Sequence, residues 1–267
     1  LDGVEIIVSV SPSQFVRPVM EQAREHISGS PILVSASKGL EVGSDLRMSE
    51  VLLEVLGADL AEGCVVLSGP SFAAELARRL PTAVTLASHS EDNAVTVQDL
   101  FQNDHFRLYT QSDVIGTELG GSLKNVIALA AGISDGLGLG DNARAALLTR
   151  SLAEITRLTH SLGGEPETLS GLAGVGDLIL TCTGDLSRNR TVGLQIGRGQ
   201  SLAEVLSGMR SVAEGVRTTK AVVDLAQSHG VEMPISVAVY SILYEDVEPR
   251  QALARLMARE PKPERWS

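Results

Sequence analysis

Lys124 is the residue of this sequence whose surroundings most favour chemistry. It is the only charged side chain in the segment LGGSLKNVI, residues 119–127. A lysine among glycines and aliphatic residues loses hydration, which lowers its pKa and suits it to proton transfer. Gly120 and Gly121 strengthen this interpretation, because glycine lets a ligand or another backbone approach closely. The alternative is a structural lysine whose stem lies along apolar surface while its ammonium group stays in water.

Two more candidates follow strand-like runs directly. Lys38 comes after the run at 31–36, and the sequence Gly69-Pro70-Ser71 comes after the run at 64–68. Ligands bind beyond the carboxyl ends of the strands in open parallel sheets, and a helix N-terminus favours anions. The plain alternatives are an ordinary loop lysine and a Ser71 that caps the helix expected at 72–79.

Asp177 and the segment SRNR at 187–190 are the candidates in the second half of the chain. Asp177 precedes the apolar run Leu-Ile-Leu, so it is either the first residue of a helix or an acceptor for substrate hydroxyls. Arg188 and Arg190 bring two guanidinium groups together, and the planar fork of arginine suits phosphate. A solvated surface turn is the alternative for this segment.

The composition excludes several classes of protein. The 267 residues carry 22 Lys and Arg against 33 Asp and Glu, a formal net charge of −11, which disfavours nucleic acid and anionic membrane surfaces as partners. A small anionic substrate remains compatible, because a local group of Lys and Arg can outweigh the overall field. Cys64 and Cys182 have no metal or redox spacing, so we expect no metal site and a reducing, cytoplasmic compartment. No apolar run is long enough to span a bilayer.

The elements that must position these residues change type along the chain. Residues 1–113 alternate β-branched runs with amphipathic segments, which predicts a mostly parallel sheet covered on both faces. Residues 114–267 show helical periodicity between glycine-rich loops at 136–140 and 171–176, which predicts an all-helical part. The expected strands are 4–10, 31–36, 64–68, 83–87 and 106–109. The expected helices are 14–27, 46–56, 72–79, 91–101, 115–133, 143–162, 191–197, 202–207, 216–229, 235–245 and 251–258.

A glycine-rich nucleotide loop is missing from this pattern. A Gly-x-Gly-x-x-Gly motif between a strand and a helix would indicate a dinucleotide cofactor, and the sequence contains none. The glycines at 136–140 and 174–176 follow no strand and are interpreted as loops or tight helix contacts. Motifs of this kind alone do not predict a dehydrogenase.

Several collinear segments together resemble the bacterial-type NAD(P)-dependent glycerol-3-phosphate dehydrogenase family. They are SASKGLE (35–41), LSGPSFAAE (67–75), LGGSLKNVI (119–127), GLAGVGDL (171–178), TCT (181–183), SRNR (187–190) and AEGVRTTK (213–220). The resemblance extends from about residue 4 to about residue 262.

The resemblance implies hydride transfer between NAD(P)H and dihydroxyacetone phosphate, giving sn-glycerol 3-phosphate for phospholipid synthesis in a cytoplasmic homodimer. It implies that Lys124 is the proton donor in reduction and the acceptor in oxidation. The implied substrate-binding residues are Lys38, Gly69, Ser71, Asp177, Ser187, Arg188 and Asn189. The implied residues for NAD or NADP are Lys38, Ala73, Arg188, Val212 and Glu214.

The sequence departs from this family where the glycine-rich cofactor loop should be. We therefore expect residues 1–113 to be the C-terminal part of an NAD(P)-binding Rossmann domain, with roughly 60–80 residues upstream, and 114–267 to be the substrate domain. A non-catalytic remnant that acts as a binding module is a second hypothesis, although every catalytic position keeps a competent residue. A third is another Rossmann-plus-helical reductase, acting on a hydroxy acid or a pyrroline, which does not account for the GPSF and SRNR segments.

Overall fold

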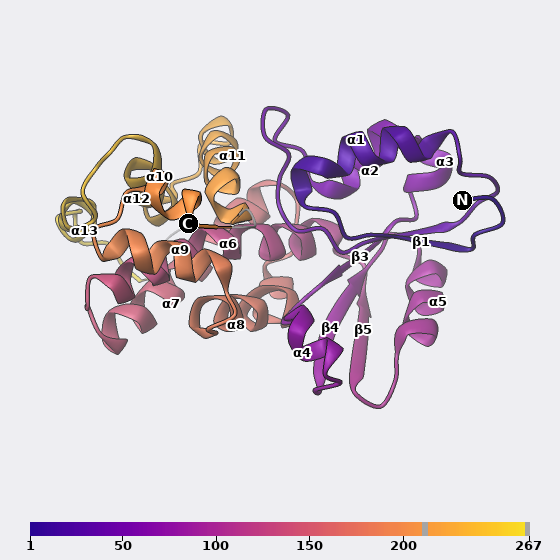
Figure 1. Cartoon of the computed structure of the whole chain (residues 1–267), viewed down its shortest axis with the longest axis horizontal. Coiled ribbons are helices and arrows are strands. Elements are labelled where there is room, and N and C mark those ends of the chain that lie inside the picture. The colour runs from indigo at the N-terminus through magenta and orange to yellow at the C-terminus, as the bar shows by residue number, and fades with distance from the viewer. Residues whose placement is uncertain (210–212, 265–267) are drawn as a thin grey trace.

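The computed structural model describes residues 1–209 and 213–264. Within this range the first part of the molecule is a five-stranded sheet with helices on both faces, and the second part is helical. Figure 1 shows the sheet part at one end of an elongated molecule and the helical part at the other. The expected fold class, a Rossmann-type α/β part followed by a helical part, is confirmed.

The elements follow one another along the chain with these bounds. The sheet part comprises β1 (Ile6–Ser9), α1 (Ser13–Arg24), β2 (Ile32–Ser35), α2 (Met48–Leu56), α3 (Ala58–Ala61), β3 (Val65–Ser68), α4 (Ala73–Ala77), β4 (Thr82–Ala87), α5 (Glu91–Phe101) and β5 (Phe106–Gln111). The helical part comprises α6 (Val114–Gly136), α7 (Asp141–Ser161), η1 (Pro166–Ser170), η2 (Leu172–Gly176), α8 (Asp177–Thr183), α9 (Arg188–Gly197), α10 (Leu202–Ser207), α11 (Glu214–Ser228), α12 (Pro234–Tyr244) and α13 (Pro249–Met257).

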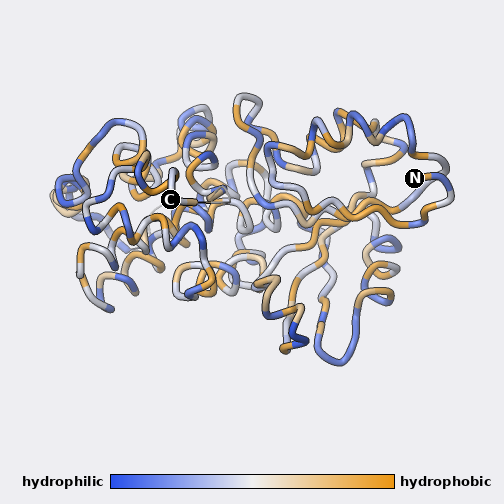
Figure 2. Tube along the Cα trace, in the orientation of Figure 1, coloured by the Kyte–Doolittle hydropathy of each residue, from blue (hydrophilic) through white to orange (hydrophobic). Residues whose placement is uncertain are grey.

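The sheet has the strand order β1-β2-β3-β4-β5, and its β3–β4 pair is antiparallel while the other pairs are parallel. Successive side chains of a strand point to opposite faces, so adjacent residues of β2 pack on different helices. Leu33 shares a buried cluster with Val16 of α1 and Leu52 of α2, whereas Val34 shares one with Val97 of α5. Figure 2 shows the apolar strands lying between these helices. The predicted mostly parallel sheet, covered on both faces, is therefore confirmed.

The carboxyl ends of β1, β2 and β3 meet at one edge of the sheet, because these three strands run parallel. Residues 37–39 and 69–71 leave the sheet at this edge. Helix α6 packs against β3 there, in the middle of the molecule (Figure 1). The loops that carry Lys38 and Gly69 are thereby brought against the helix that carries Lys124.

Helix α6 is the centre of the helical part. It is buried on almost all sides, and Val126, Ile127 and Leu129 are inaccessible to solvent. Helices α7, α8, α9, α11 and α12 all pack against it. A helix that is apolar all round is stable only when it is enclosed in this way, so the single lysine in its middle has no route to bulk water except through a cleft.

Three local predictions are wrong. Residues 171–176, expected as a loop, include the π-helical turn η2, because glycine and alanine leave no side-chain pattern that would indicate it. Helix α8 is missing from the expected helices, since seven residues are too few to show helical periodicity, although the interpretation of Asp177 as the first residue of a helix is confirmed. Helix α4 is shorter than expected, and Ser71 is not its N-cap. Phe72 holds that position, and the Ser71 hydroxyl donates to the carbonyl oxygen of Gly69 at 3.0 Å.

Candidate active site

Two lysines and one aspartate from three separate elements meet below the edge of the sheet. Lys124 of α6 donates from Nζ to Oδ1 of Asp177, the first residue of α8. Lys38, in the loop after β2, donates from Nζ to Asp177 Oδ2 at 2.7 Å and to the carbonyl oxygen of Gly69 at 3.0 Å. Lys124 is 7% exposed and Asp177 is 1% exposed. The fold thus places two ammonium groups, that of Lys124 buried and that of Lys38 partly exposed, on the two oxygens of one buried carboxylate.

Burial and neighbouring charge set the protonation of this cluster. Burial, followed by the positive charge of Lys38, lowers the pKa of Lys124 to about 8, against the opposing attraction of Asp177. Burial alone would raise the pKa of Asp177, but the two lysines outweigh it and the pKa lies below its ordinary value. Two cations on one anion leave a net positive charge, which suits an anionic ligand or a developing oxyanion. Lys124 can also exchange its proton near neutral pH.

The glycines before Lys124 explain how these elements come so close. A Cβ at Gly120 would lie 2.4 Å from the carbonyl oxygen of Ala173 in η2, and one at Gly121 would lie 2.6 Å from Ser68 Oγ. The same Cβ at Gly121 would touch the stem of Lys38, 3.7 Å away. A side chain at Gly120 would push the backbone of η2 away from α6, and one at Gly121 would clash with the hydroxyl of Ser68 and pack against the stem of Lys38. The close backbone approach expected at these glycines is what the structure contains.

A cleft of about 630 Å³ opens above the lysines. Of the residues predicted to form the site, those that line it are Lys38, Ser71, Ala73, Lys124, Ser187, Arg188, Asn189 and Glu214. Asp177 and Gly69 lie beneath it as the acceptors of the two lysines. Val212 lies outside the described residues. The structure therefore gathers around one cleft residues that are far apart in the sequence.

The two arginines of the SRNR segment have different roles. Arg190 pairs with the partly buried Asp135 at the far end of α6, from Nε at 3.0 Å and from Nη2 at 2.9 Å. Asp135 is also paired with Arg144. Arg188 is exposed and lines the cleft. The interpretation that both guanidinium groups are available for phosphate is therefore wrong, because Asp135 already holds Arg190, and only Arg188 faces the cleft.

Ser187 and Glu214 occupy the starts of two helices at the cleft. Ser187 is the N-cap of α9, and its hydroxyl accepts from the backbone N–H of Arg190 at 3.3 Å. Glu214 begins α11, where burial raises its pKa against the positive charge of Arg188. Each of these residues thus stands at the start of a helix and also presents a polar side chain to the cleft.

Two further cleft residues are not predicted from the sequence. Asn125 accepts at Oδ1 from Nδ2 of Asn189 at 3.0 Å, and Asn189 Oδ1 in turn accepts from the N–H of Gly215. Thr181 lines the cleft one helical turn after Asp177, with its hydroxyl 3.3 Å from Asp177 Oδ1. The position of Asn125 beside Lys124 in the sequence was an available signal. Thr181 also had a signal, since it begins the segment TCT (181–183) that carries part of the family resemblance.

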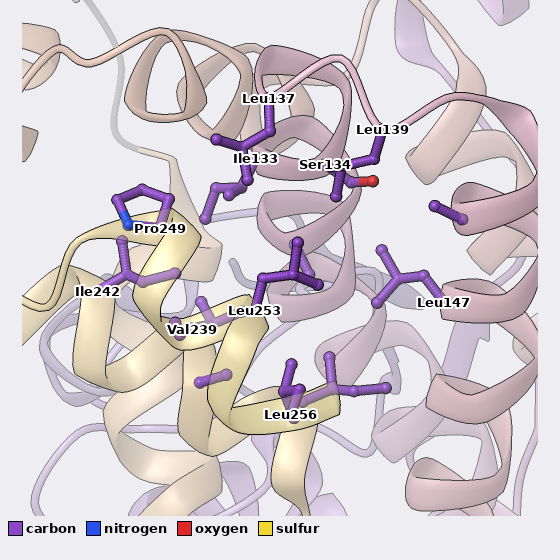
Figure 3. Close-up of a pocket in the computed structure, with 15 residues that line it drawn as sticks. Ile133, Ser134, Leu137, Leu139, Leu147, Val239, Ile242, Pro249, Leu253 and Leu256 are labelled. Atoms are coloured by element: carbon purple, nitrogen blue, oxygen red, sulfur yellow. The ribbon is translucent and has the colours of Figure 1, made fainter. Parts of the chain in front are cut away.

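A second cavity lies at the other end of α6 and offers no comparable chemistry. It has a volume of about 110 Å³ and lies between α6, α7, α12 and α13. Figure 3 shows aliphatic side chains such as Leu147, Val239 and Leu253 around it, with the hydroxyl of Ser134 as the polar group among those labelled. No charged side chain is among its described lining residues. We therefore place the candidate site in the cleft over Lys124.

Within residues 1–209 and 213–264, no three His, Cys, Asp or Glu side chains are grouped so that they could hold a metal ion. None of the helices described there combines the length and the apolar character that a bilayer crossing requires.

Comparisons with known proteins agree with one another. Residues 1–94 match the family described as NAD-dependent glycerol-3-phosphate dehydrogenase N-terminus, and residues 113–254 match its C-terminus. The chain is 55% identical over 264 residues to glycerol-3-phosphate dehydrogenase [NAD(P)+] of Geobacter sulfurreducens, covering 99% of this chain and 79% of the relative. The relative from Koribacter versatilis, with the same name, is 54% identical over 267 residues, which are 100% of this chain and 79% of the relative. The crystal structure of glycerol-3-phosphate dehydrogenase from Coxiella burnetii superposes with a TM-score of 0.92 at 43% identity, covering 97% of this chain and 78% of the other.

Proposed function

The chain belongs to the NAD-dependent glycerol-3-phosphate dehydrogenase family, and we propose that it catalyses the reversible NAD(P)H-dependent reduction of dihydroxyacetone phosphate to sn-glycerol 3-phosphate. The observation that carries this proposal is the buried cluster of Lys124, Lys38 and Asp177 beneath one cleft. A ketone that accepts a hydride at carbon needs a proton at oxygen, and Lys124 is the buried acid at the cleft whose pKa lies near neutrality.

Lys124 acts as the general acid in the reduction. As the carbonyl carbon becomes tetrahedral, negative charge develops on its oxygen, and the Lys124 ammonium group gives that oxygen a proton. In the oxidation the neutral amine takes the proton back from the alcohol. Asp177 holds the Lys124 nitrogen in place in both directions. A pKa of about 8 lets the same side chain serve either direction at cellular pH.

Lys38 and Arg188 are the cations proposed to hold the substrate. The phosphate of the substrate is a dianion near neutral pH, so it needs positive charge that no carboxylate already neutralises. Arg188 is exposed on the cleft wall and has this property. Lys38 lies deeper, 19% exposed and bonded to Asp177, where it faces the polar end of a small molecule. Asn125, Thr181 and Asn189 add hydrogen-bonding groups around it.

The residues of the cleft fit the nicotinamide part of the cofactor. Ala73 is small and exposed at the rim, so a flat ring can approach it, and Arg188 and Glu214 add a cation and an acceptor. Together with Lys38 they form the proposed cofactor contacts, to which the family resemblance also assigns Val212, while Ser71 stays among the proposed substrate-binding residues. When bound, NAD(P)H supplies the hydride to the substrate carbon.

Two alternative functions have less support. A hydroxy-acid or pyrroline reductase would share the fold, but the family match extends over both parts of the chain. A non-catalytic binding module would not need a buried lysine with a lowered pKa, whose burial is itself costly. The intact Lys124–Asp177–Lys38 cluster therefore favours an enzyme.

We also propose the setting in which the enzyme works. The division of the chain into a cofactor-binding part at 1–113 and a substrate part at 114–267 places Lys124 just beyond the boundary, beside the loop of Lys38. Two free, buried cysteines support a reducing cytoplasm. The family resemblance supports a homodimer that makes glycerol 3-phosphate for phospholipid synthesis.

The substitution Lys124→Ala in the full-length protein tests the proposed function. Loss of the general acid and of its place on Asp177 is expected to lower kcat for dihydroxyacetone phosphate by several orders of magnitude, about 10²–10⁴ from proton transfer alone. The matched control is Lys220→Ala, at an exposed position on α11. NADH oxidation would be followed at saturating substrate. Turnover within tenfold of the wild type would remove Lys124 from the mechanism, and tight substrate binding by a wild type that shows no turnover would favour a binding module.

A further inference from the structure

The segment that carries Lys38 is attached to α6 at two places that the proposed mechanism does not use. At the first, the backbone N–H of Gly39 donates to Ser122 Oγ at 3.0 Å. At the second, Glu118 accepts from Arg47 Nη1 at 2.6 Å, from the N–H of Ser49 at 2.8 Å and from Ser49 Oγ at 2.6 Å. Residues 39–49 of the sheet part are thereby bonded to the helix that presents Lys124.

Both acceptors on α6 are deeply buried. Ser122 is 1% exposed and Glu118 is 6% exposed. Burial raises the pKa of Glu118, while Arg47 and Ser49 oppose this shift. A buried carboxylate costs free energy unless its partners satisfy it, and removing one partner is strongly destabilising. Glu118 therefore holds its three donors firmly, although it lies outside the cleft.

The two attachments act as one unit. Ser122 and Glu118 lie one turn apart on α6, and the Ser122 hydroxyl donates to the Glu118 carbonyl oxygen at 2.7 Å. On the other side, Leu40 pairs with Arg47 in an antiparallel bridge, and the N–H of Glu41 donates to the carbonyl oxygen of Leu46. The loop between the two attachments is closed on itself, so it cannot shift at one end without moving the other.

We propose that Ser122 and Glu118 are positioning residues, which fasten the Lys38 loop to α6 so that Lys38 and Lys124 reach the two oxygens of Asp177 at the same time. Lys38 joins the cluster through a flexible four-carbon stem. Its backbone must therefore be fixed if its ammonium group is to stay at 2.7 Å from the Asp177 carboxylate. Ser122, two positions before Lys124 in the sequence, fixes the backbone of Gly39, which follows Lys38. This inference rests on the proposed function.

Displacement of Lys38 changes the pKa of Lys124, which a mere loss of stability does not do. The charge of Lys38 lowers the pKa of Lys124, and Asp177 raises it. The other titratable groups whose interaction with Lys124 the structure gives are Cys182 of α8 and Glu214 of α11. When Lys38 moves away, Lys124 loses a repelling neighbour and keeps Asp177, so its pKa rises.

The test is the pair of substitutions Ser122→Ala and Glu118→Gln, with Ser134→Ala as the matched control. Ser134 is a buried serine on the same helix, about 18 Å further along at 1.5 Å per residue. For Ser122→Ala we expect kcat to fall about ten- to a hundredfold, since a displacement of 1 Å has effects of this order. The alkaline limb of the pH–rate profile for ketone reduction should move to higher pH. Glu118→Gln should lower kcat and move the alkaline limb to higher pH, each by less than Ser122→Ala does. Ser134→Ala should have the kcat and the pH profile of the wild type.

The midpoint of the alkaline limb does not depend on the fraction of the sample that is folded. It therefore reports the pKa of Lys124 even when a variant folds poorly. An unmoved limb in both Ser122→Ala and Glu118→Gln would overturn the positioning role, whatever happens to kcat. If Lys124→Ala is inactive while Ser122→Ala behaves like the wild type, this inference alone fails. If Lys124→Ala remains active, the proposed function fails first.

Discussion

Two carboxylates are buried equally deeply in the helical part, and their surroundings drive them to opposite protonation behaviour. Asp177, 1% exposed, accepts from two lysine ammonium groups, and its pKa lies below the ordinary value. Glu154 of α7, 2% exposed, accepts from the backbone N–H groups of Ile235 at 2.9 Å and Ser236 at 3.4 Å. Burial raises the pKa of Glu154 to about 7.

The difference lies in the charge of the donors. Burial penalises both carboxylates, but only Asp177 has cations in direct contact, whereas Arg157 and Arg259 act on Glu154 through weaker charge interactions. Glu154 covers the N–H groups of the first turn of α12, which is the role of a helix cap. Burial of an acid is thus not by itself a sign of a catalytic site. A buried acid that is bonded to lysine ammonium groups beside a cleft is a better indication of such a site.

Removal of the charge of Asp177 should have the largest effect. In Asp177→Asn the two ammonium groups face each other without a counter-ion, which lowers the pKa of Lys124 further. Lys124 is then less protonated and its nitrogen is no longer held in place, so kcat should fall about a hundred- to a thousandfold, within the range of a general acid's contribution. The alkaline limb of the reduction should move to lower pH, opposite to the shift expected for Ser122→Ala. Steady-state kinetics across pH measures both, with the exposed Asp59→Asn as control. An alkaline limb at the wild-type pH would mean that Asp177 does not influence the pKa of Lys124.

Removal of the charge of Glu154 should change stability and leave kcat unaltered. Below pH 4.5 Glu154 is protonated in both the folded and the unfolded chain. Between pH 4.5 and about 7 the unfolded chain releases the proton first, so stability falls as pH rises, by about 3 kcal/mol in total. The free energy of unfolding of Glu154→Gln should therefore lack the decrease between pH 5 and pH 8 that the titration of Glu154 causes in the wild type.

Urea unfolding at a series of pH values measures the effect of Glu154→Gln. The exposed Glu167→Gln, on η1, is the control. A pH dependence identical to that of the wild type would show that Glu154 is not the buried acid that titrates, and a large loss of kcat would remove the contrast with Asp177.

Another carboxylate of α6, Asp135, whose side chain is 8% exposed, extends the comparison to the two arginines of α9. Asp135 holds Arg190 and Arg144 as Asp177 holds two lysines, but away from the cleft. Arg188→Ala should therefore raise KM for dihydroxyacetone phosphate about ten- to a hundredfold, the value of a charge-assisted hydrogen bond. Arg190→Ala should leave KM within about twofold and lower the thermal midpoint instead. Equal changes in KM would show that Asp135 does not neutralise Arg190.

Much of the fold could be predicted from local patterns. Apolar runs predicted β1 to β4, as expected for strands of a covered sheet, whereas β5 was predicted from residues 106–109, where buried and exposed residues alternate. The glycines beside Lys124 indicated a close approach to α6. The π-helical turn η2 could not be predicted, and of α8 only the first residue, Asp177, was indicated, since these short segments are held by contacts with α6 rather than by their own periodicity.

For the site, the sequence by itself determined which residues are chemically competent: a lysine in an apolar segment, a lysine after a strand, an aspartate before an apolar run and two neighbouring arginines. Their partners were decided by the tertiary structure. Asp177 lies far from Lys38 in the sequence, and only the packing of α8 and the sheet edge against α6 places its carboxylate between two ammonium groups. The same packing turned Arg190 toward Asp135 and left Arg188 at the cleft. The physical reason is that charge interactions depend on distance and burial, and neither can be read from the order of residues along the chain.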